Sequence, residues 1–431
     1  MGLHRAVGVG FGVAVSVGAV VGVGMLRTPS LIAGHVPDVF LIAALWVIGG
    51  MNAMLDANVL AELAVLTPRA GGPYIYARRA LGDLGGLIVG WADWLNITSG
   101  VAVVSIGCIE FATILAPQLN AHVTVAALLL QLAFYSINLL GLRQGAWTQN
   151  ITSLIKMAFL FFVVVAIFMS VPHATAKPAT VVLSFGGIVL GYQLVVGAYS
   201  GWNAPTYFAE EKTDPARQLP RALFTGVALV AVLYVLFNLA LSRALPLSAL
   251  GATALPAAAA MGSLFGSAAA SLVAAVAILC ALSSLNAGMM MAPRILFGLS
   301  RDKLFLGQGT RINRGGTPYA TLLVTAAFSL GIAATGTFET VFLLVGIFTV
   351  LVNVLMTVSF FVLRFRAGAL ERGYRARGYP WLPTVALTLD SALLLAFIAV
   401  NPRGAVYGAG LMLALVPIWL LLKQRRRKAA R

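Results

Sequence analysis

Charged residues are scarce in this chain of 431 residues. Aspartate, glutamate, lysine and arginine together make up 10% of the chain, and hydrophobic residues make up 60%, whereas an ordinary soluble domain is about 25% charged. This composition excludes a soluble globular protein. Because a membrane-spanning helix needs about 20 mostly apolar residues, the chain has room for about a dozen crossings, which is the size of a secondary transporter.

Cysteine and histidine are also rare. Cys108 and Cys280 lie far apart inside apolar stretches, and the four histidines are scattered near the ends of apolar segments. Zinc sites and nucleophilic catalysis need such side chains in clusters. We therefore expect two small buried cysteines, no metal site, no cofactor and no enzymatic chemistry.

Apolar runs bounded by glycine, proline or charge predict twelve membrane-spanning helices. Their approximate ranges are 6–32, 39–66, 84–116, 121–141, 150–171, 182–209, 220–244, 266–300, 318–336, 338–365, 380–400 and 404–423. The pattern predicts an all-α polytopic membrane protein.

Basic residues are distributed unevenly between the two predicted sides of the membrane. Of the 29 lysines and arginines, 24 lie on the side of the termini, four lie on the other side, and Lys156 lies within a span. The positive-inside rule then makes both termini cytoplasmic. The net charge of +16 is thus explained by the orientation of the chain in the membrane, and no nucleic-acid partner is predicted from it.

Glycine interrupts the first and the sixth predicted helices in mid-membrane. The first contains Gly18-Ala19-Val20-Val21-Gly22-Val23-Gly24, and the sixth contains Gly197-Ala198-Tyr199-Ser200-Gly201-Trp202-Asn203. Glycine costs about 1 kcal/mol per helical position relative to alanine, although small residues four apart also serve helix packing. These helices occupy corresponding positions in two five-helix halves, a pairing that points to the binding site of an inverted-repeat transporter.

An unwound helix leaves backbone groups that need a partner from protein, a cavity or a ligand. The new helix near Gly24 offers free N–H groups to a carboxylate, and the broken end near Ala198 and Tyr199 offers carbonyl groups to an ammonium. This arrangement suits an α-amino acid.

Several motifs, in chain order, resemble the amino acid, polyamine and organocation (APC) superfamily of transporters. They include Gly22-Val23-Gly24-Met25-Leu26 with Pro29, Ala61-Glu62-Leu63, Gly71-Gly72-Pro73-Tyr74-Ile75-Tyr76, Gly90-Trp91-Ala92-Asp93-Trp94, Gly201-Trp202-Asn203 with Glu210-Glu211, and Gly378-Tyr379-Pro380-Trp381. Within the superfamily, the stretch from Tyr199 to Asn203 is most similar to the L-type branch of neutral amino acid transporters and its bacterial relatives.

The resemblance implies a LeuT-like fold, a five-plus-five inverted repeat with unwound helices 1 and 6. Residues 1–175 would form the first repeat, 176–366 the second, and 367–431 two further helices and a basic cytoplasmic tail. A bundle of helices 1, 2, 6 and 7 would rock against a scaffold. The implied substrate site consists of Val20, Val21, Gly22, Val23, Gly24, Val196, Gly197, Ala198, Tyr199, Gly201, Trp202 and Ser284.

The chain departs from the family pattern at two positions of this site. Val23 stands where the family commonly has serine, so backbone N–H groups must bind the carboxylate alone. Gly197 stands where the L-type branch has an aromatic gate. Either the pocket admits a bulkier side chain, or another aromatic residue such as Tyr192 forms the gate.

Lys156 is the one basic residue predicted deep within a span. An unpaired cation there costs about 2.5–3.5 kcal/mol, so it either faces a cavity or snorkels to the interface. The resemblance implies that its ammonium takes the place of a second sodium ion behind helix 1. We expect Lys156 to stabilise that backbone and, in a proton-coupled transporter, to titrate during the cycle.

Other charged residues also fall within predicted spans. Arg27 is predicted to snorkel at the outer face. For Asp56, Asp93, Glu110 and Asp390, pairing with arginine or a helix end is favoured over a proton relay. None of the four lies on helix 1, 6 or 8, so the pocket is predicted to lack a carboxylate, which favours neutral over cationic substrates.

The predicted function is sodium-independent transport of neutral L-amino acids by a multi-pass protein of a bacterial inner membrane, as a proton-linked symporter or an exchanger. A cationic amino acid or polyamine transporter is the alternative, and it would depend on Asp56 or Asp93. An amino acid sensor that binds without transport is another. The expected partners are the substrate, the lipid bilayer and, for a symporter, protons. No disulfide-linked partner is expected, because neither cysteine lies in an outer loop.

Overall fold

The computed structural model describes residues 8–69, 71–140, 146–170, 182–211, 214–314, 316–366 and 373–429, and these ranges contain helices but no strand. The helices are α1 (Val9–Val20), α2 (Val23–His35), α3 (Val39–Leu66), α4 (Pro73–Ala112), η1 (Pro117–His122), α5 (Val123–Leu139), α6 (Ala146–Met169), α7 (Phe185–Tyr199), η2 (Ala204–Glu211), α8 (Pro215–Ala244), α9 (Leu247–Gly251), α10 (Pro256–Phe265), α11 (Ser267–Arg301), η3 (Gly307–Thr310), α12 (Tyr319–Thr335), α13 (Phe338–Arg366), α14 (Trp381–Val400), α15 (Pro402–Leu413) and α16 (Leu415–Ala429).

Each of the twelve predicted spans coincides with a helix or a pair of helices among the described residues. Eight helical segments are long and apolar enough to cross a membrane, and α1 with α2 adds a ninth span that is bent by 42°. The apolar segment Leu154–Met169 of α6 and the helices α7 and α12 occupy the other three predicted spans. The all-α fold class predicted from the sequence is therefore confirmed.

One predicted boundary was wrong. The third predicted span begins near residue 84, but α4 begins at Pro73, where proline occupies the first turn, and it is interrupted at Gly82, whose φ is 79°. The last predicted span, 404–423, matches the apolar segment Pro402–Gln424, which is divided into α15 and α16 around Ala414. Pro417 lacks the N–H group that would continue the helix to the carbonyl of Leu413.

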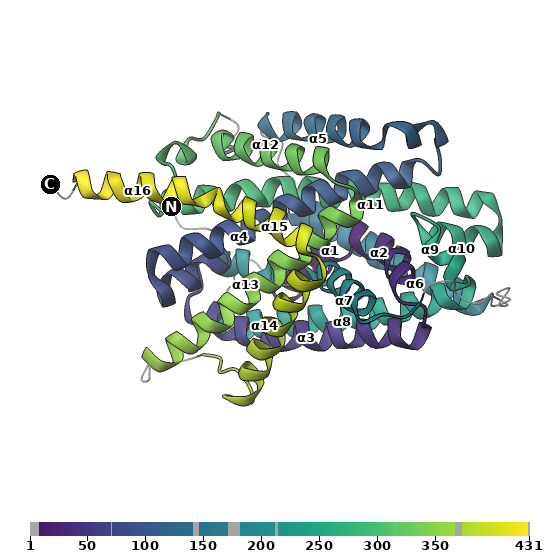
Figure 1. Cartoon of the computed structure of the whole chain (residues 1–431), viewed down its shortest axis with the longest axis horizontal. Helices are drawn as coiled ribbons and strands as arrows, with labels where there is room; N and C mark the ends of the chain where they lie inside the picture. Colours follow the sequence, from purple (N-terminus) through teal and green to yellow (C-terminus); the bar gives the residue numbers. More distant parts are fainter. Residues whose placement is uncertain are drawn as a thin grey trace.

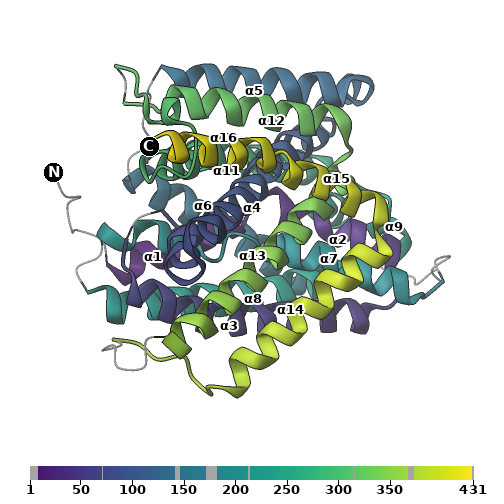
Figure 2. The same cartoon turned by 60° about the vertical axis from the view of Figure 1, so that its left-hand side comes forward.

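The helices pack in two groups. In one group, α3 and α1 pack against α8, while α7 contacts α2 and α3; in the other, α4 packs against α11, α12 and α13. The helix α13 also contacts α7 and α3, so it joins the two groups. The pair α5 and α12 lies along one edge of the molecule (Figures 1 and 2), and α16 extends beyond the body (Figure 1).

Three buried aromatic side chains hold the first group together. The ring centroids of Trp46 and Tyr234 are 5.0 Å apart, and those of Tyr199 and Tyr234 are 5.1 Å apart. These separations are favourable for aromatic pairs. The cluster joins α3, α7 and α8 beside the point at which α7 ends.

Candidate functional site

The first helix break lies at Val21 and Gly22. Val21 is extended (φ −75°, ψ 99°), and Gly22 precedes α2 with φ −156° and ψ −155°. Because no side chain caps α2, its first-turn N–H groups have neither an intrahelical nor a side-chain cap partner. These N–H groups form the positive end of the helix dipole.

The second break follows Tyr199. Ser200 is extended (φ −55°, ψ 138°), and Gly201 has a φ of 103°, in the left-handed region that favours glycine. A Cβ atom at Gly201 would lie 3.3 Å from the carbonyl carbon of Ala19. Glycine therefore permits both the turn and the close approach of the two breaks.

A tyrosine hydroxyl bridges the two broken ends. The hydroxyl of Tyr234, on α8, lies 3.0 Å from the carbonyl oxygen of Val20 and 3.0 Å from that of Ala198. Ser16 adds a second link by donating to the carbonyl of Trp202 at 3.2 Å. The sequence reasoning missed Tyr234, although a tyrosine within the apolar span 220–244 was an available signal.

A cavity of about 170 Å³ lies between the breaks. Of the predicted substrate-site residues, its wall includes Val20, Gly22, Val23, Gly24, Gly197, Ala198, Gly201, Trp202 and Ser284, and does not include Val21, Val196 or Tyr199. The hydroxyl of Tyr199 instead donates to the carbonyl of Trp46 at 2.9 Å. The cavity thus brings both glycine-interrupted segments to one place, and contact with a substrate stays a prediction.

Phe342 of α13 covers the cavity next to both breaks. A Cβ atom added at Gly24 would lie 3.0 Å from the ring of Phe342, and one added at Gly197 would lie 3.3 Å from the same ring. Phe342 therefore occupies the space beside Gly197, and Tyr192 does not line the cavity. The aromatic ring that the structure places beside Gly197 is thus that of Phe342, not that of Tyr192.

The cavity wall contains a carboxylate. Asp93, on α4, lines the cavity and accepts a hydrogen bond of 2.7 Å from the hydroxyl of Tyr207. The prediction of a pocket without a carboxylate was wrong, because it considered helices 1, 6 and 8 and left out α4, which passes directly beside the site.

Lys156 lies against α1 and is 2% exposed. Its ammonium donates to the hydroxyl of Ser284 at 2.8 Å and to the carbonyl of Gly18 at 3.3 Å. The snorkelling alternative is therefore excluded. Ser284 lies between the ammonium and the first break, since a Cβ atom at Gly22 would be 3.1 Å from its hydroxyl oxygen.

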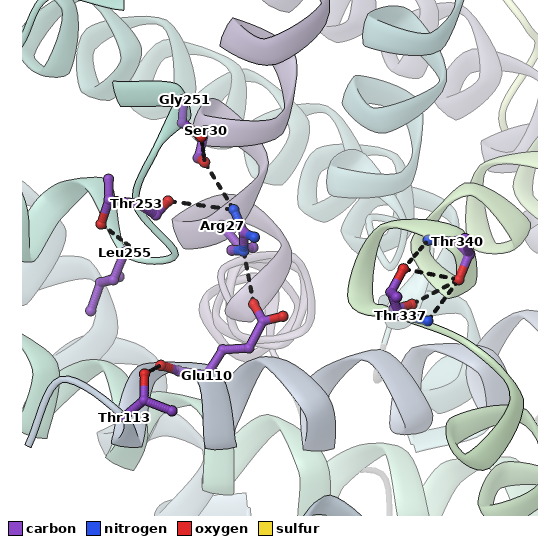
Figure 3. A network of polar contacts seen from close by, with 9 residues as sticks. All are labelled: Arg27, Ser30, Glu110, Thr113, Gly251, Thr253, Leu255, Thr337 and Thr340. Carbon is purple, nitrogen blue, oxygen red and sulfur yellow. Dashed lines mark hydrogen bonds and ion pairs between the residues drawn. The ribbon is translucent and has the colours of Figure 1, made fainter. Parts of the chain in front are cut away.

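Arg27 is held in a polar network rather than extended alone toward an interface. Its Nε lies 2.8 Å from Glu110 of α4, and its Nη1 donates to Ser30 at 2.9 Å and to the carbonyl of Thr253 at 3.4 Å (Figure 3). The snorkelling prediction for Arg27 was wrong, and the structural pairing predicted for Glu110 is confirmed. Figure 3 also shows the separate hydrogen-bonded turn of Thr337 and Thr340 at the start of α13.

The pairing with arginine or a helix end that was predicted for the remaining carboxylates fails for Asp56, Asp93 and Asp390. Within the described parts of the chain, none of the three is paired with arginine or lysine. Asp56 and Asp390 both contact Asn52, and Asp56 also contacts Asn353. Cys108 and Cys280 are free and buried as expected, and the described residues contain no cluster suited to a metal ion.

Known proteins resemble this chain over nearly its whole length. The family model described as "Amino acid permease" matches residues 12–422. The serine/threonine exchanger SteT of Bacillus subtilis is 23% identical, over 99% of this chain and 98% of its own. The branched-chain amino acid permease BcaP of Bacillus subtilis is 25% identical, over 88% of this chain and 85% of its own. The large neutral amino acids transporter small subunit 2 of Homo sapiens is 25% identical, over 97% of this chain and 80% of its own.

Proposed function

Because this chain belongs to the amino acid permease family of the APC superfamily, and is thus an amino acid transporter and not an enzyme, we propose that it carries neutral L-amino acids without sodium. The transport is by alternating access, as a proton-linked symporter or an exchanger. The observation that carries this proposal is the pair of helix breaks that meet at one cavity.

The chemistry of the two breaks suits a zwitterion. The free N–H groups at the start of α2 bind the substrate carboxylate, with the helix dipole adding to the attraction. Carbonyl groups at the end of α7 bind the ammonium. The cavity of about 170 Å³ suits a small solute, since an apolar cavity of about 150 Å³ holds a benzene molecule.

A neutral side chain fits the rest of the cavity wall. Beside the breaks the wall is largely apolar, with Val101, Val104, Phe342 and Val345 among its residues. The names of these three relatives specify serine and threonine, branched-chain amino acids and large neutral amino acids, respectively. All of these substrates are neutral.

The position of Lys156 supports the proposal that transport is independent of sodium. Its ammonium donates hydrogen bonds to the carbonyl of Gly18 and to the hydroxyl of Ser284. A fixed positive charge therefore replaces a bound cation at this position. The same charge stabilises the end of α1 at the break.

Transport requires the cavity to open to each side in turn. Phe342 lines the cavity, and its ring stacks at 5.4 Å between centroids on that of Phe338, over which the guanidinium of Arg27 lies. In the proposed cycle these two rings close the cavity on the side of Arg27. Opening on that side needs α2 to leave Glu110. The excess of basic residues on the side of the termini supports a cytoplasmic location for both ends, and the proposed location is a bacterial inner membrane.

A cationic substrate is the second candidate, because Asp93 supplies a carboxylate to the cavity wall. Such a substrate would place its side-chain charge beside Asp93 and Tyr207. The neutral substrate is preferred, because Asp93 already accepts a hydrogen bond from Tyr207.

Counterflow in sodium-free proteoliposomes tests the proposal. Liposomes preloaded with a neutral amino acid should take up the same labelled amino acid, and N-acetylated or esterified forms should not compete. Uptake of arginine or putrescine alone would refute the neutral substrate. Binding without any flux would instead identify an amino acid sensor.

A further inference from the structure

Two buried carboxyl groups share one amide donor. Asp56 lies on α3 and Asp390 on α14, and the two residues are 4% and 0% exposed. The amide nitrogen of Asn52 lies 3.5 Å from a carboxyl oxygen of Asp56 and 3.1 Å from a carboxyl oxygen of Asp390. Both residues lie in helices long and apolar enough to cross a membrane.

Among the residues that the structure describes, this pair has no counter-ion. Their hydrogen-bond donors are amides: Asn353 donates to Asp56 at 2.7 Å, and Asn52 donates to Asp390 at 3.1 Å. Within the described residues neither carboxyl pairs with a cation, whereas the buried Glu62 lies 2.6 Å from Arg364. Two adjacent ionised carboxylates in an apolar interior are strongly unfavourable unless a cation or a proton neutralises them.

Several oxygens of the cluster have no hydrogen-bond partner among the described residues. They are Oδ1 of Asp56, Oδ2 of Asp390, Oδ1 of Asn52 and the hydroxyl of Tyr192. A buried polar atom without a partner needs an explanation. One proton shared between the two carboxyl groups would give a partner to both carboxyl oxygens.

A second, smaller cavity lies beside Asp56 and shares part of its wall with the substrate cavity. Its volume is about 10 Å³, and its wall includes Asp56, Trp202, Asn203 and Asn353. The last three also line the large cavity. A void of about 10–15 Å³ holds a single water molecule, so the small cavity has room for one water beside Asp56 and none for an amino acid.

The cluster joins elements from both groups of helices. Asn52 and Asp56 belong to α3, Tyr192 to α7, Asn353 to α13 and Asp390 to α14. If α3 and α7 move against α13 during transport, the bond between Asn353 and Asp56 changes, and the affinity of the pair for a proton changes with it.

We infer that Asp56 and Asp390 form a proton-binding site that couples proton movement to amino acid transport. This inference rests on the proposed function and selects the proton-linked symporter over the exchanger. The pair takes up a proton from the substrate cavity in one conformation and releases it in another. Tyr192, on α7, is a further titratable group near the pair among the described residues, and its hydroxyl is buried.

The test compares gradient-driven accumulation with counterflow in proteoliposomes that contain a pH-sensitive dye. A one-to-one symporter should accumulate its substrate up to about tenfold for each pH unit of gradient, because one unit is a tenfold ratio of proton activity. We expect Asp56→Asn and Asp390→Asn to lose this accumulation and the acidification of the lumen. Both should keep counterflow, which needs no net proton movement.

Asp38→Asn is the matched control. Asp38 is an exposed residue that caps α3 by accepting from the N–H of Leu41, and asparagine caps equally well. This variant should behave like the unmodified protein. Asp390→Glu, which keeps a carboxyl group, should retain accumulation with a displaced pH dependence.

The possible failures are distinguishable. Accumulation retained in both asparagine variants, accumulation driven by sodium, or transport without acidification would overturn the proton site and leave the transporter intact. No flux by the unmodified protein would overturn the proposed function as well. Infrared spectra of the unmodified protein do not depend on how the variants fold: a protonated carboxyl band is expected at neutral pH, and its absence would refute the inference.

Discussion

Removing the hydroxyl of Tyr234 should weaken the site at both helix breaks. The hydroxyl lies 3.0 Å from the carbonyls of Val20 and Ala198, so Tyr234→Phe leaves these buried carbonyls without that donor. An unsatisfied buried polar group costs about 1–3 kcal/mol. Since about 1.4 kcal/mol is a factor of ten, we expect roughly a five- to 100-fold loss of counterflow at low substrate concentration, together with a lower melting temperature.

The matched control for this variant is Tyr135→Phe. Tyr135 is also buried, and its hydroxyl lies 2.8 Å from that of Ser329, between α5 and α12. The control should lower the melting temperature but leave counterflow unchanged, because Tyr135 does not line the cavity. Unchanged counterflow by Tyr234→Phe at normal expression would refute the bridging role of the hydroxyl.

Three further variants test other parts of the site. Counterflow by Lys156→Ala should be at least about tenfold slower than that of the unmodified protein, because hydrogen bonds to a charged group contribute about 1.5–3 kcal/mol. Equal uptake at normal expression would contradict the role of the ammonium. Asp93→Asn should change neutral amino acid uptake by less than about fivefold, since a typical hydrogen bond contributes about 1 kcal/mol; a complete loss would favour the cationic substrate. Glu110→Gln should release α2 from α4 and speed hydrogen exchange at residues 338–342, measured by mass spectrometry, whereas unchanged exchange would contradict a closing role for the Arg27 pair.

The helix breaks could be predicted because glycine marks them locally. Gly22 and Gly201 lie at the two interruptions that the sequence pattern indicated. The helical spans were equally visible, since long apolar runs have few alternatives in a membrane. The start of α4 was missed because Arg78 and Arg79 interrupt the apolar run, although both residues are helical.

The parts of the site that come from other helices could not be predicted. Three of its side chains come from other helices, namely Phe342 from α13, Asp93 from α4 and Tyr234 from α8. No local sequence pattern indicates which face of a buried helix meets the cavity. The contact that Asp56 and Asp390 share with Asn52 joins residues 334 positions apart. Such pairs depend on which helices pack together, and the spacing of apolar residues does not determine this.

Thermal unfolding of the purified protein with amino acids and their derivatives tests the central claim most directly. A ligand that binds only the folded state adds about 2.7 kcal/mol of stability at 100 times its dissociation constant. Neutral L-amino acids should stabilise the protein, and N-acetylation or esterification of the same amino acids should abolish the effect, because each removes one charge from the zwitterion. Equal stabilisation by the blocked derivatives, or stabilisation by cations alone, would contradict binding of a zwitterion at the two helix breaks.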